Sequence, residues 1–196
     1  MRLFTGIDLP AEVVRNLERL LDRLRPAARV RWSPPANLHI TTRFIGEWPA
    51  ERLPELEAAL AALPGLLRGL LPGLLPGDGA IPIQVRKLGF FPNPHAPRVF
   101  WAGVEASPGL AALAFETDRA VATLGLEPEG RPFSPHLTLA RIKEPVDLQK
   151  LRETIAALPS LEFGDFAADR FHLYQSRLSP AGSVYTKLAE FPLAKR

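Results

Sequence analysis

The stretch NLHITTRFIG, residues 37–46, places the tripeptide His-x-Thr inside a largely apolar, β-prone segment, and SPHLTLARI, residues 134–142, repeats it. β-Branched and aromatic residues bounded by turn-forming residues predict a strand in each place. Two of the four histidines of the chain therefore fall in the same tripeptide, once in each half. This repetition predicts a duplicated architecture in which two equivalent strands each present one histidine.

The segments around these two strands favour an α+β fold. Apolar residues at helical spacing predict helices over 10–25, 49–63, 108–124 and 147–158, the last with Asp147 as its N-cap. The predicted strands cover residues 2–9, 38–46, 81–92, 97–106, 134–142, 161–179 and 183–193. Each half follows the order strand, helix, His-x-Thr strand, helix, strands. We therefore expect residues 1–196 to form a single domain with a bilobal duplicated architecture of two pseudo-symmetric lobes.

The stretch 64–80, rich in Gly, Pro and Leu, interrupts this order. Its apolar content argues against a solvated linker, and its helix-breaking residues argue against one long helix. We expect a packed loop or short helical turns there.

The composition excludes several classes of function. The absence of cysteine excludes disulfides, thiolate catalysis and cysteine-based zinc sites. No apolar run reaches the roughly 18 residues that span a bilayer, and Asp8 and Pro10 interrupt the start where a signal peptide is apolar. We expect a cytoplasmic monomer with no membrane partner. The net charge of +3 mildly favours an anionic partner such as RNA.

Side-chain alternation places His39 and Thr41 on one face of the first strand, and His136 and Thr138 on one face of the second. If the strands face each other, two imidazoles and two hydroxyls meet. Because an imidazole has an ordinary pKa near 6.5, one histidine can accept a proton while a protonated partner donates one. In-line hydrolysis of a phosphodiester needs both transfers, and the hydroxyls can donate to the non-bridging oxygens.

The residues alone leave open two non-catalytic explanations of the repeated His-x-Thr tripeptide. A histidine on a half-buried strand is commonly a hydrogen-bonded core residue, so the repetition can be a coincidence. A metal site is a weaker alternative, because neither clustered carboxylates nor a third clear histidine ligand accompanies the pair. We expect no metal ion and no other cofactor. We expect His95 to lie in an exposed turn. The face that His172 shares with Arg170 and Tyr174 either is exposed, as we expect, or borders the cleft between the strands.

The chain resembles the two-histidine phosphoesterase superfamily, and within it the bacterial and archaeal RNA 2′,3′-cyclic phosphodiesterases, historically called 2′-5′ RNA ligases. The matching segments, in order along nearly the whole chain, are RLFTGIDLP, RWSPPANLHITTRFIGE, LGFFPNPHAPRVFWAGV, FSPHLTLARI and FHLYQSRLSPAGSVYTKLAEFPL. The resemblance implies two antiparallel sheets that line a central cleft, with helices on the outside.

The resemblance also implies metal-independent hydrolysis of RNA 2′,3′-cyclic phosphate ends, or of related cyclic nucleotides, to 2′-phosphomonoesters. By position, His39 would be the proton donor and His136 the proton acceptor, while Thr41 and Thr138 would hold the phosphate. Two alternatives remain: 2′-5′ RNA ligation on the same site, and a module that binds RNA ends without turnover.

Four further residues are candidate substrate contacts. The family tends to carry a basic residue shortly after the second tripeptide, here Arg141. Strict alternation puts Arg141 on the wrong face, and a bulge or the end of the strand would swing it into the cleft. Arg43 shares the face of His39 by alternation and is a second candidate cation. Trp32 and Phe133 are favoured over Phe90, Phe91 and Trp101 for stacking on a base, because each lies in a loop that leads into a histidine strand.

Overall fold

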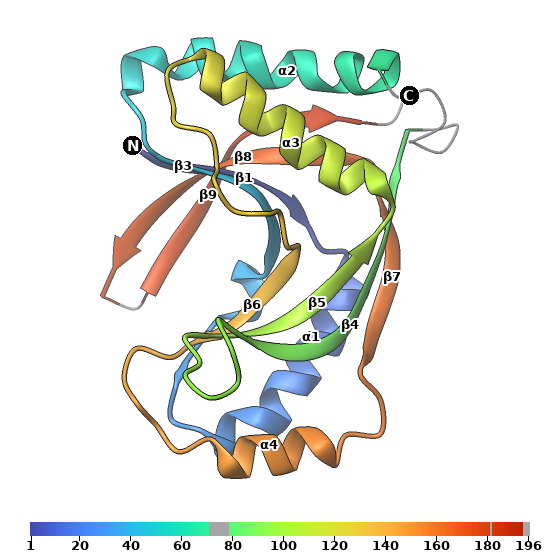
Figure 1. Cartoon of the computed structure of the whole chain (residues 1–196), viewed down its shortest axis with the longest axis vertical. Helices are drawn as coiled ribbons and strands as arrows, with labels where there is room; N and C mark the ends of the chain where they lie inside the picture. Colours follow the sequence, from blue (N-terminus) through green and yellow to red (C-terminus); the bar gives the residue numbers. More distant parts are fainter. Residues whose placement is uncertain (71–78, 181, 194–196) are drawn as a thin grey trace.

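The computed structural model describes residues 1–70, 79–180 and 182–193, and its strands form two antiparallel sheets (Figure 1). The four-stranded sheet has the order β3-β1-β8-β9, and the five-stranded sheet has the order β2-β6-β5-β4-β7. The strands are β1 (Arg2–Asp8), β2 (Arg31–Trp32), β3 (His39–Glu47), β4 (Ile81–Phe91), β5 (Val99–Ala106), β6 (His136–Arg141), β7 (Glu162–Ala168), β8 (Arg170–Ser179) and β9 (Gly182–Pro192). The expected α+β class and the pair of antiparallel sheets are confirmed.

The helices cover the two sheets in pairs, as Figure 1 shows. They are α1 (Ala11–Leu24), α2 (Leu53–Leu70), α3 (Pro108–Thr123) and α4 (Gln149–Ala156). Helices α2 and α3 pack on each other and on strands β9 and β3 of the four-stranded sheet, whereas α1 packs on α4 and on β7 of the five-stranded sheet. Among the described residues, no helix has the length and apolar character needed to cross a membrane.

Helix α2 runs farther than the sequence predicted. It continues through Pro64 to Leu70, although a proline inside a helix removes one backbone hydrogen bond. Leu63 and Leu67 on either side of this proline are almost fully buried, and burial of each such side chain contributes about 2 kcal/mol. The packed loop or short helical turns expected from residue 64 are therefore wrong up to Leu70, where one continuous helix is present instead, and residues 71–78 lie outside the described residues.

Two local details also differ from the prediction. The N-cap of helix α4 is Leu148 and not Asp147. Asp147 lies one position earlier, where its Oδ1 accepts a hydrogen bond from the Gln149 amide at 2.8 Å. The connector before β3 contains the short strand β2, which pairs with β6. This pairing attaches the chain leading into the first histidine strand to the second histidine strand.

Candidate active site

His39 begins β3 and lies within a group of aromatic rings. Its ring stacks on Phe4 with 4.6 Å between centroids, and it meets Tyr185 nearly at right angles at 5.2 Å. Gly6 of β1 leaves the space that this arrangement needs, because a Cβ there would lie 2.8 Å from the carbonyl oxygen of Ile40 and 3.4 Å from Cδ2 of His39. These neighbours hold the imidazole in one orientation.

His136 begins β6 in a matching way. Its ring contacts Phe91 of β4 nearly at right angles, with 5.1 Å between centroids. Nδ1 of His136 donates a hydrogen bond to the carbonyl oxygen of Ser134 at 2.8 Å, and Nδ1 of His39 donates to that of Asn37 at 2.8 Å. In both cases the acceptor lies two residues before the histidine. The bond fixes the tautomer and leaves Nε2 as the ring atom that can exchange a proton.

The two histidine strands belong to different sheets but lie next to each other, with Cα atoms within 8 Å across β3 and β6. Burial lowers the pKa of His39 below its ordinary value, and the positive charges of Arg141 and His136 lower it further. The bond to Asn37 and the carboxylate of Asp8 act in the opposite direction without reversing the shift. His136 is therefore close enough to influence the protonation of His39.

A β-bulge follows the first tripeptide. The pairing of β3 with β1 is regular from His39 to Thr41, so these two side chains share one face. Thr42 is then skipped, because Thr41 and Arg43 pair with consecutive residues of β1. Such a bulge shifts the alternation by one residue. Phe44 consequently returns to the face of His39, where its ring joins the aromatic group and remains 53% exposed.

The same irregularity follows the second tripeptide. The pairing of β6 with β5 is regular from His136 to Thr138, and Leu139 is then skipped. Leu139 and Ala140 are both fully buried, whereas Arg141 is exposed. A bulge, one of the two ways in which Arg141 was expected to reach the face of His136, is present, and it places Arg141 on that face. Burial lowers the pKa of His136, and the charge of Arg141 lowers it further, against the opposing bond to the carbonyl of residue 134.

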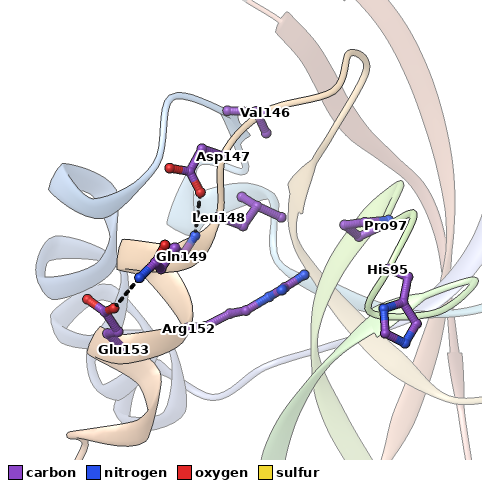
Figure 2. A pocket seen from close by; sticks show the side chains of 8 residues that line it. All are labelled: His95, Pro97, Val146, Asp147, Leu148, Gln149, Arg152 and Glu153. Carbon is purple, nitrogen blue, oxygen red and sulfur yellow. Dashed lines mark hydrogen bonds between the residues drawn. The ribbon is translucent and has the colours of Figure 1, made fainter.

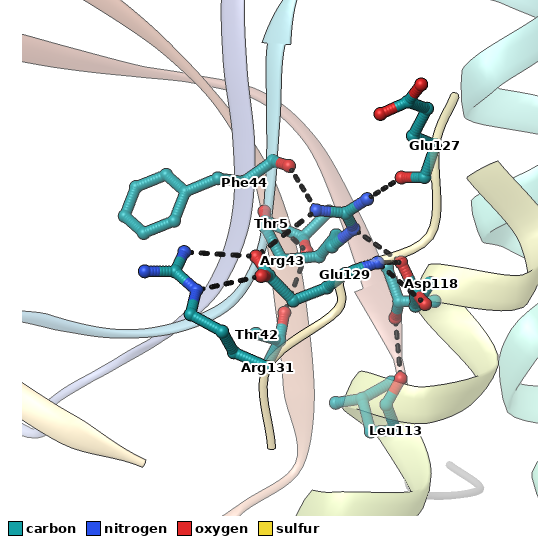
Figure 3. A network of polar contacts seen from close by, with 10 residues as sticks. Thr5, Thr42, Arg43, Phe44, Leu113, Asp118, Glu127, Glu129 and Arg131 are labelled. Atoms are coloured by element: carbon teal, nitrogen blue, oxygen red, sulfur yellow. Dashed lines mark hydrogen bonds and ion pairs between the residues drawn. The ribbon is translucent and has the colours of Figure 1, made fainter. Parts of the chain in front are cut away.

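Arg43 turns away from His39, so its predicted place beside the histidines is wrong. Its guanidinium lies against α3, where Nε forms an ion pair with Asp118 at 2.7 Å and Nη1 lies 3.6 Å from Glu129 (Figure 3). Nη2 donates to the carbonyl oxygen of Glu127 at 2.6 Å. The reason is the bulge, which keeps Arg43 on the core side of the sheet. Arg43 ties β3 to the segment that leads into β6.

The aromatic residues favoured from the sequence lie elsewhere than expected. Trp32 meets the fully buried ring of Phe100 at 6.0 Å, on the core side of the five-stranded sheet, so its expected position beside a substrate base is wrong. Phe133 is half-buried and packs against the hydrophobic core. Phe4 and Tyr185 contact His39 instead, and Phe91 contacts His136. Phe91 was one of the less favoured aromatic candidates, whereas sequence alternation alone could not identify Phe4 and Tyr185, because their strands are distant from β3 along the chain.

Asp8 is a neighbour of His39 that the sequence analysis missed. It is the pairing partner of His39 in β1, and its carboxylate accepts hydrogen bonds from Tyr174 and Lys187. Burial raises the pKa of Asp8, but the bonds from Lys187 and Tyr174, together with the charge of His172, outweigh it and lower the pKa. Asp8 therefore remains a carboxylate at neutral pH. Its position in the segment RLFTGIDLP was the only signal for it.

The two other histidines occupy contrasting environments. His95 is exposed in the loop between β4 and β5, as expected. His172 is only 2% exposed, and its Nε2 lies 3.3 Å from Glu190, so the expectation of an exposed His172 is wrong. Its place in β8, between β1 and β9 in the sheet, accounts for the burial.

A hollow of about 520 Å³ lies between the β4–β5 loop and the start of α4 (Figure 2). It is lined by His95 and Arg152 among others, and Arg152 donates a hydrogen bond to the carbonyl oxygen of Pro94. Neither histidine of the two tripeptides reaches it, so we do not assign the proton-transfer chemistry to this hollow. In the part of the chain that the structure describes, no three His, Cys, Asp or Glu side chains are grouped so that they could hold a metal ion.

Comparison with known proteins agrees with this arrangement. A family model described as LigT like Phosphoesterase matches residues 7–66 and 104–185. An RNA 2′,3′-cyclic phosphodiesterase of Methanothermobacter thermautotrophicus is 34% identical over 98% of this chain and 99% of its own. The crystal structure of TT0787 of Thermus thermophilus matches with a TM-score of 0.78 and 34% identity over 98% of both chains. The crystal structure of E. coli LigT complexed with 3′-AMP matches with a TM-score of 0.70 and 28% identity, over 99% of this chain and 98% of its own. The chain belongs to the LigT-like phosphoesterase family of two-histidine phosphoesterases.

Proposed function

We propose that this protein hydrolyses RNA 2′,3′-cyclic phosphate ends to 2′-phosphomonoesters by acid–base catalysis from its two histidines, without a metal ion. The observation that carries the proposal is the matched pair of imidazoles, His39 and His136. Each begins a strand, each is held through Nδ1 by the carbonyl two residues before it, and each keeps Nε2 available. The relatives named RNA 2′,3′-cyclic phosphodiesterase support the choice of substrate.

The proposed reaction needs two proton transfers. Nε2 of His136 takes a proton from water, and the water oxygen bonds to phosphorus while the bond from phosphorus to the 3′ oxygen breaks. Nε2–H of His39 gives its proton to the departing 3′ oxygen, which becomes a hydroxyl, and the phosphate stays on the 2′ oxygen. General acid–base catalysis of this kind contributes about 10²–10⁴-fold to the rate.

The surroundings of the two histidines favour this division of roles. The carboxylate of Asp8 raises the pKa of His39 against its burial, and no carboxylate has that effect on His136. His136 therefore lacks the carboxylate that would favour its protonated form, as suits a base. An anionic phosphate bound between the two rings further favours the protonated form of a nearby histidine.

The phosphate itself is proposed to lie between Thr41, Thr138 and Arg141. The regular pairing of β3 and β6 over the tripeptides puts each threonine on the face of its histidine, and the bulge in β6 puts Arg141 there as well. Hydroxyl and guanidinium donors aimed at the non-bridging oxygens stabilise the charge held there in the transition state.

The test uses an oligonucleotide that ends in a 2′,3′-cyclic phosphate, incubated with the protein in EDTA. We expect a product that keeps its phosphate on the 2′ hydroxyl, and we expect His39→Ala and His136→Ala each to lose at least about a hundredfold in rate. His95→Ala is the matched control, because that histidine is exposed in a loop. Full activity in both site variants contradicts the mechanism, and tight binding of the end without product indicates a binding module.

A further inference from the structure

A second hollow, of about 280 Å³, adjoins the candidate active site through Arg141, which lines it. Three more cations line the same hollow: Arg29 and Arg31 from the connector before β3, and Lys143 just after β6. Glu144 is the one acidic residue among those that line it. The hollow is therefore strongly basic, although the net charge of the whole chain is only +3.

The cations of this hollow are not neutralised by the protein. Within residues 1–70, 79–180 and 182–193, no ion pair involves Arg29, Arg31, Arg141 or Lys143. Arg43 illustrates the contrast, because its guanidinium is held by two carboxylates. Cations without protein partners remain available for an external anion.

Arg31 and Arg141 are direct partners across strands β2 and β6. Like charges opposite each other in an antiparallel pair are destabilising, and no carboxylate of the described residues forms an ion pair with either arginine. Trp32 faces the core beside Phe100, so alternation directs Arg31 to the other side of β2, the side that carries the histidines. The guanidinium also approaches the β8–β9 hairpin, since a Cβ built on Gly182 would lie 3.5 Å from its Nη2.

We propose that Arg29, Arg31 and Lys143 form a subsite for the RNA backbone on the 5′ side of the cyclic end. This inference rests on the proposed function and extends it from the reacting phosphate to the next phosphodiester groups. A strand that ends in a 2′,3′-cyclic phosphate continues only through the 5′ oxygen of its last nucleotide. The row of cations that begins at Arg141 gives that continuing backbone a path away from the histidines.

The subsite predicts a preference for oligonucleotides. A nucleoside 2′,3′-cyclic phosphate with a free 5′ hydroxyl has no second phosphate and gains nothing from these cations. A trinucleotide with the same cyclic end places phosphodiesters against them. Each charge-assisted contact that forms strengthens the binding of the trinucleotide alone, and the advantage decreases with salt, because phosphate contacts release counterions.

The experiment compares kcat/KM for the trinucleotide and for the cyclic mononucleotide in the wild type and in Arg29→Ala/Arg31→Ala. We expect the ratio of the two values to fall at least about tenfold in the double variant, since hydrogen bonds to charged groups are lost on one substrate only. Arg2→Ala/Arg15→Ala is the control with the same change in charge, on exposed positions of β1 and α1. It is expected to keep the wild-type ratio.

Binding of the 2′-phosphate-ended trinucleotide, measured by fluorescence anisotropy over a range of salt, gives a readout that needs no turnover. The slope of log affinity against log salt is expected to fall by about 0.7 for each phosphate contact removed. If the double variant keeps both the wild-type ratio of the two kcat/KM values and the wild-type salt slope, the subsite is overturned. A wild type that hydrolyses neither substrate overturns the proposed function, and the salt slopes of the variants then decide the subsite separately.

Discussion

Phe44 and Arg141 occupy equivalent positions on the two histidine strands. Each is the fifth residue after its histidine, and each is the first side chain to return to the histidine's face after a β-bulge. The duplicated tripeptide therefore extends into a duplicated backbone irregularity, with an aromatic ring at the equivalent point of one strand and a cation at that of the other. Both are exposed, so both are free to contact a substrate.

Arg141→Ala is expected to lower kcat/KM about a hundredfold, because in the proposed mechanism it removes a donor to the developing charge on phosphate. The charge of Arg141, after burial, lowers the pKa of both histidines, so its removal also raises both pKa values and moves the pH optimum upward. Arg2→Ala, which removes an exposed charge far from β6 in sequence, serves as control. Wild-type kcat/KM and an unmoved optimum would remove Arg141 from the site.

Arg43→Ala is expected to show the opposite pattern. The loss of the ion pair with Asp118 and of the bond to Glu127 leaves a largely buried carboxylate without its cation, at a cost of about 2 kcal/mol. The melting temperature is expected to fall by about 4–8 °C, while kcat/KM of the folded protein changes little. Arg25→Ala provides the comparison of an exposed ion pair, formed with Asp22 of α1. A large loss of activity without loss of stability contradicts the structural role.

The positions of Arg141 and Arg43 show how much could be predicted from the sequence. Apolar periodicity identified the helices and strands, and the repeated tripeptide identified the two histidines that the fold brings together. The bulge in β3 was beyond that reasoning, because a bulge exists only in the pairing with the neighbouring strand, and local alternation assumes that there is none. Arg43 was misplaced for this reason. The bulge in β6 was considered only as one of two ways in which Arg141 could reach the cleft. Asp8 was missed because its strand approaches His39 only in the folded chain.

Phe44→Ala is expected to raise KM with little effect on kcat. Its ring is 53% exposed on the face of His39 and offers a surface on which the terminal base can stack, an interaction that contributes about 1–3 kcal/mol per base. Phe44→Tyr keeps the aromatic face and is expected to restore KM. Phe115→Ala is the control, since that ring is comparably exposed on α3. Equal KM values in all three variants would exclude the stacking role.

Asp8→Asn is expected to alter the pH dependence rather than the fold. The carboxylate raises the pKa of His39, so its replacement by an amide of the same shape lowers that pKa further. The alkaline limb of the profile of kcat/KM then moves to lower pH, because His39 loses its donated proton earlier. Glu190→Gln is the matched control: Glu190 contacts His172 but has no part in the shift of His39. Identical pH profiles for the two variants would show that Asp8 does not raise the pKa of His39.

The pH profile of the wild type follows from the lowered pKa values of both histidines. Burial is the main cause for each, so in the free protein His39 and His136 both lose their protons below their ordinary value near 6.5. The reactive form has a protonated donor and a neutral acceptor, and kcat/KM reports the free protein. The optimum of kcat/KM is therefore expected below pH 6.5. The rate falls on the acid side as His136 is protonated and on the alkaline side as His39 is deprotonated.

The bound phosphate favours protonation of the histidines, so the optimum of kcat is expected at higher pH than that of kcat/KM. Rates measured from about pH 4.5 to about pH 9 in constant ionic strength check this, and a kcat/KM that still rises above about pH 7.5 contradicts a histidine donor.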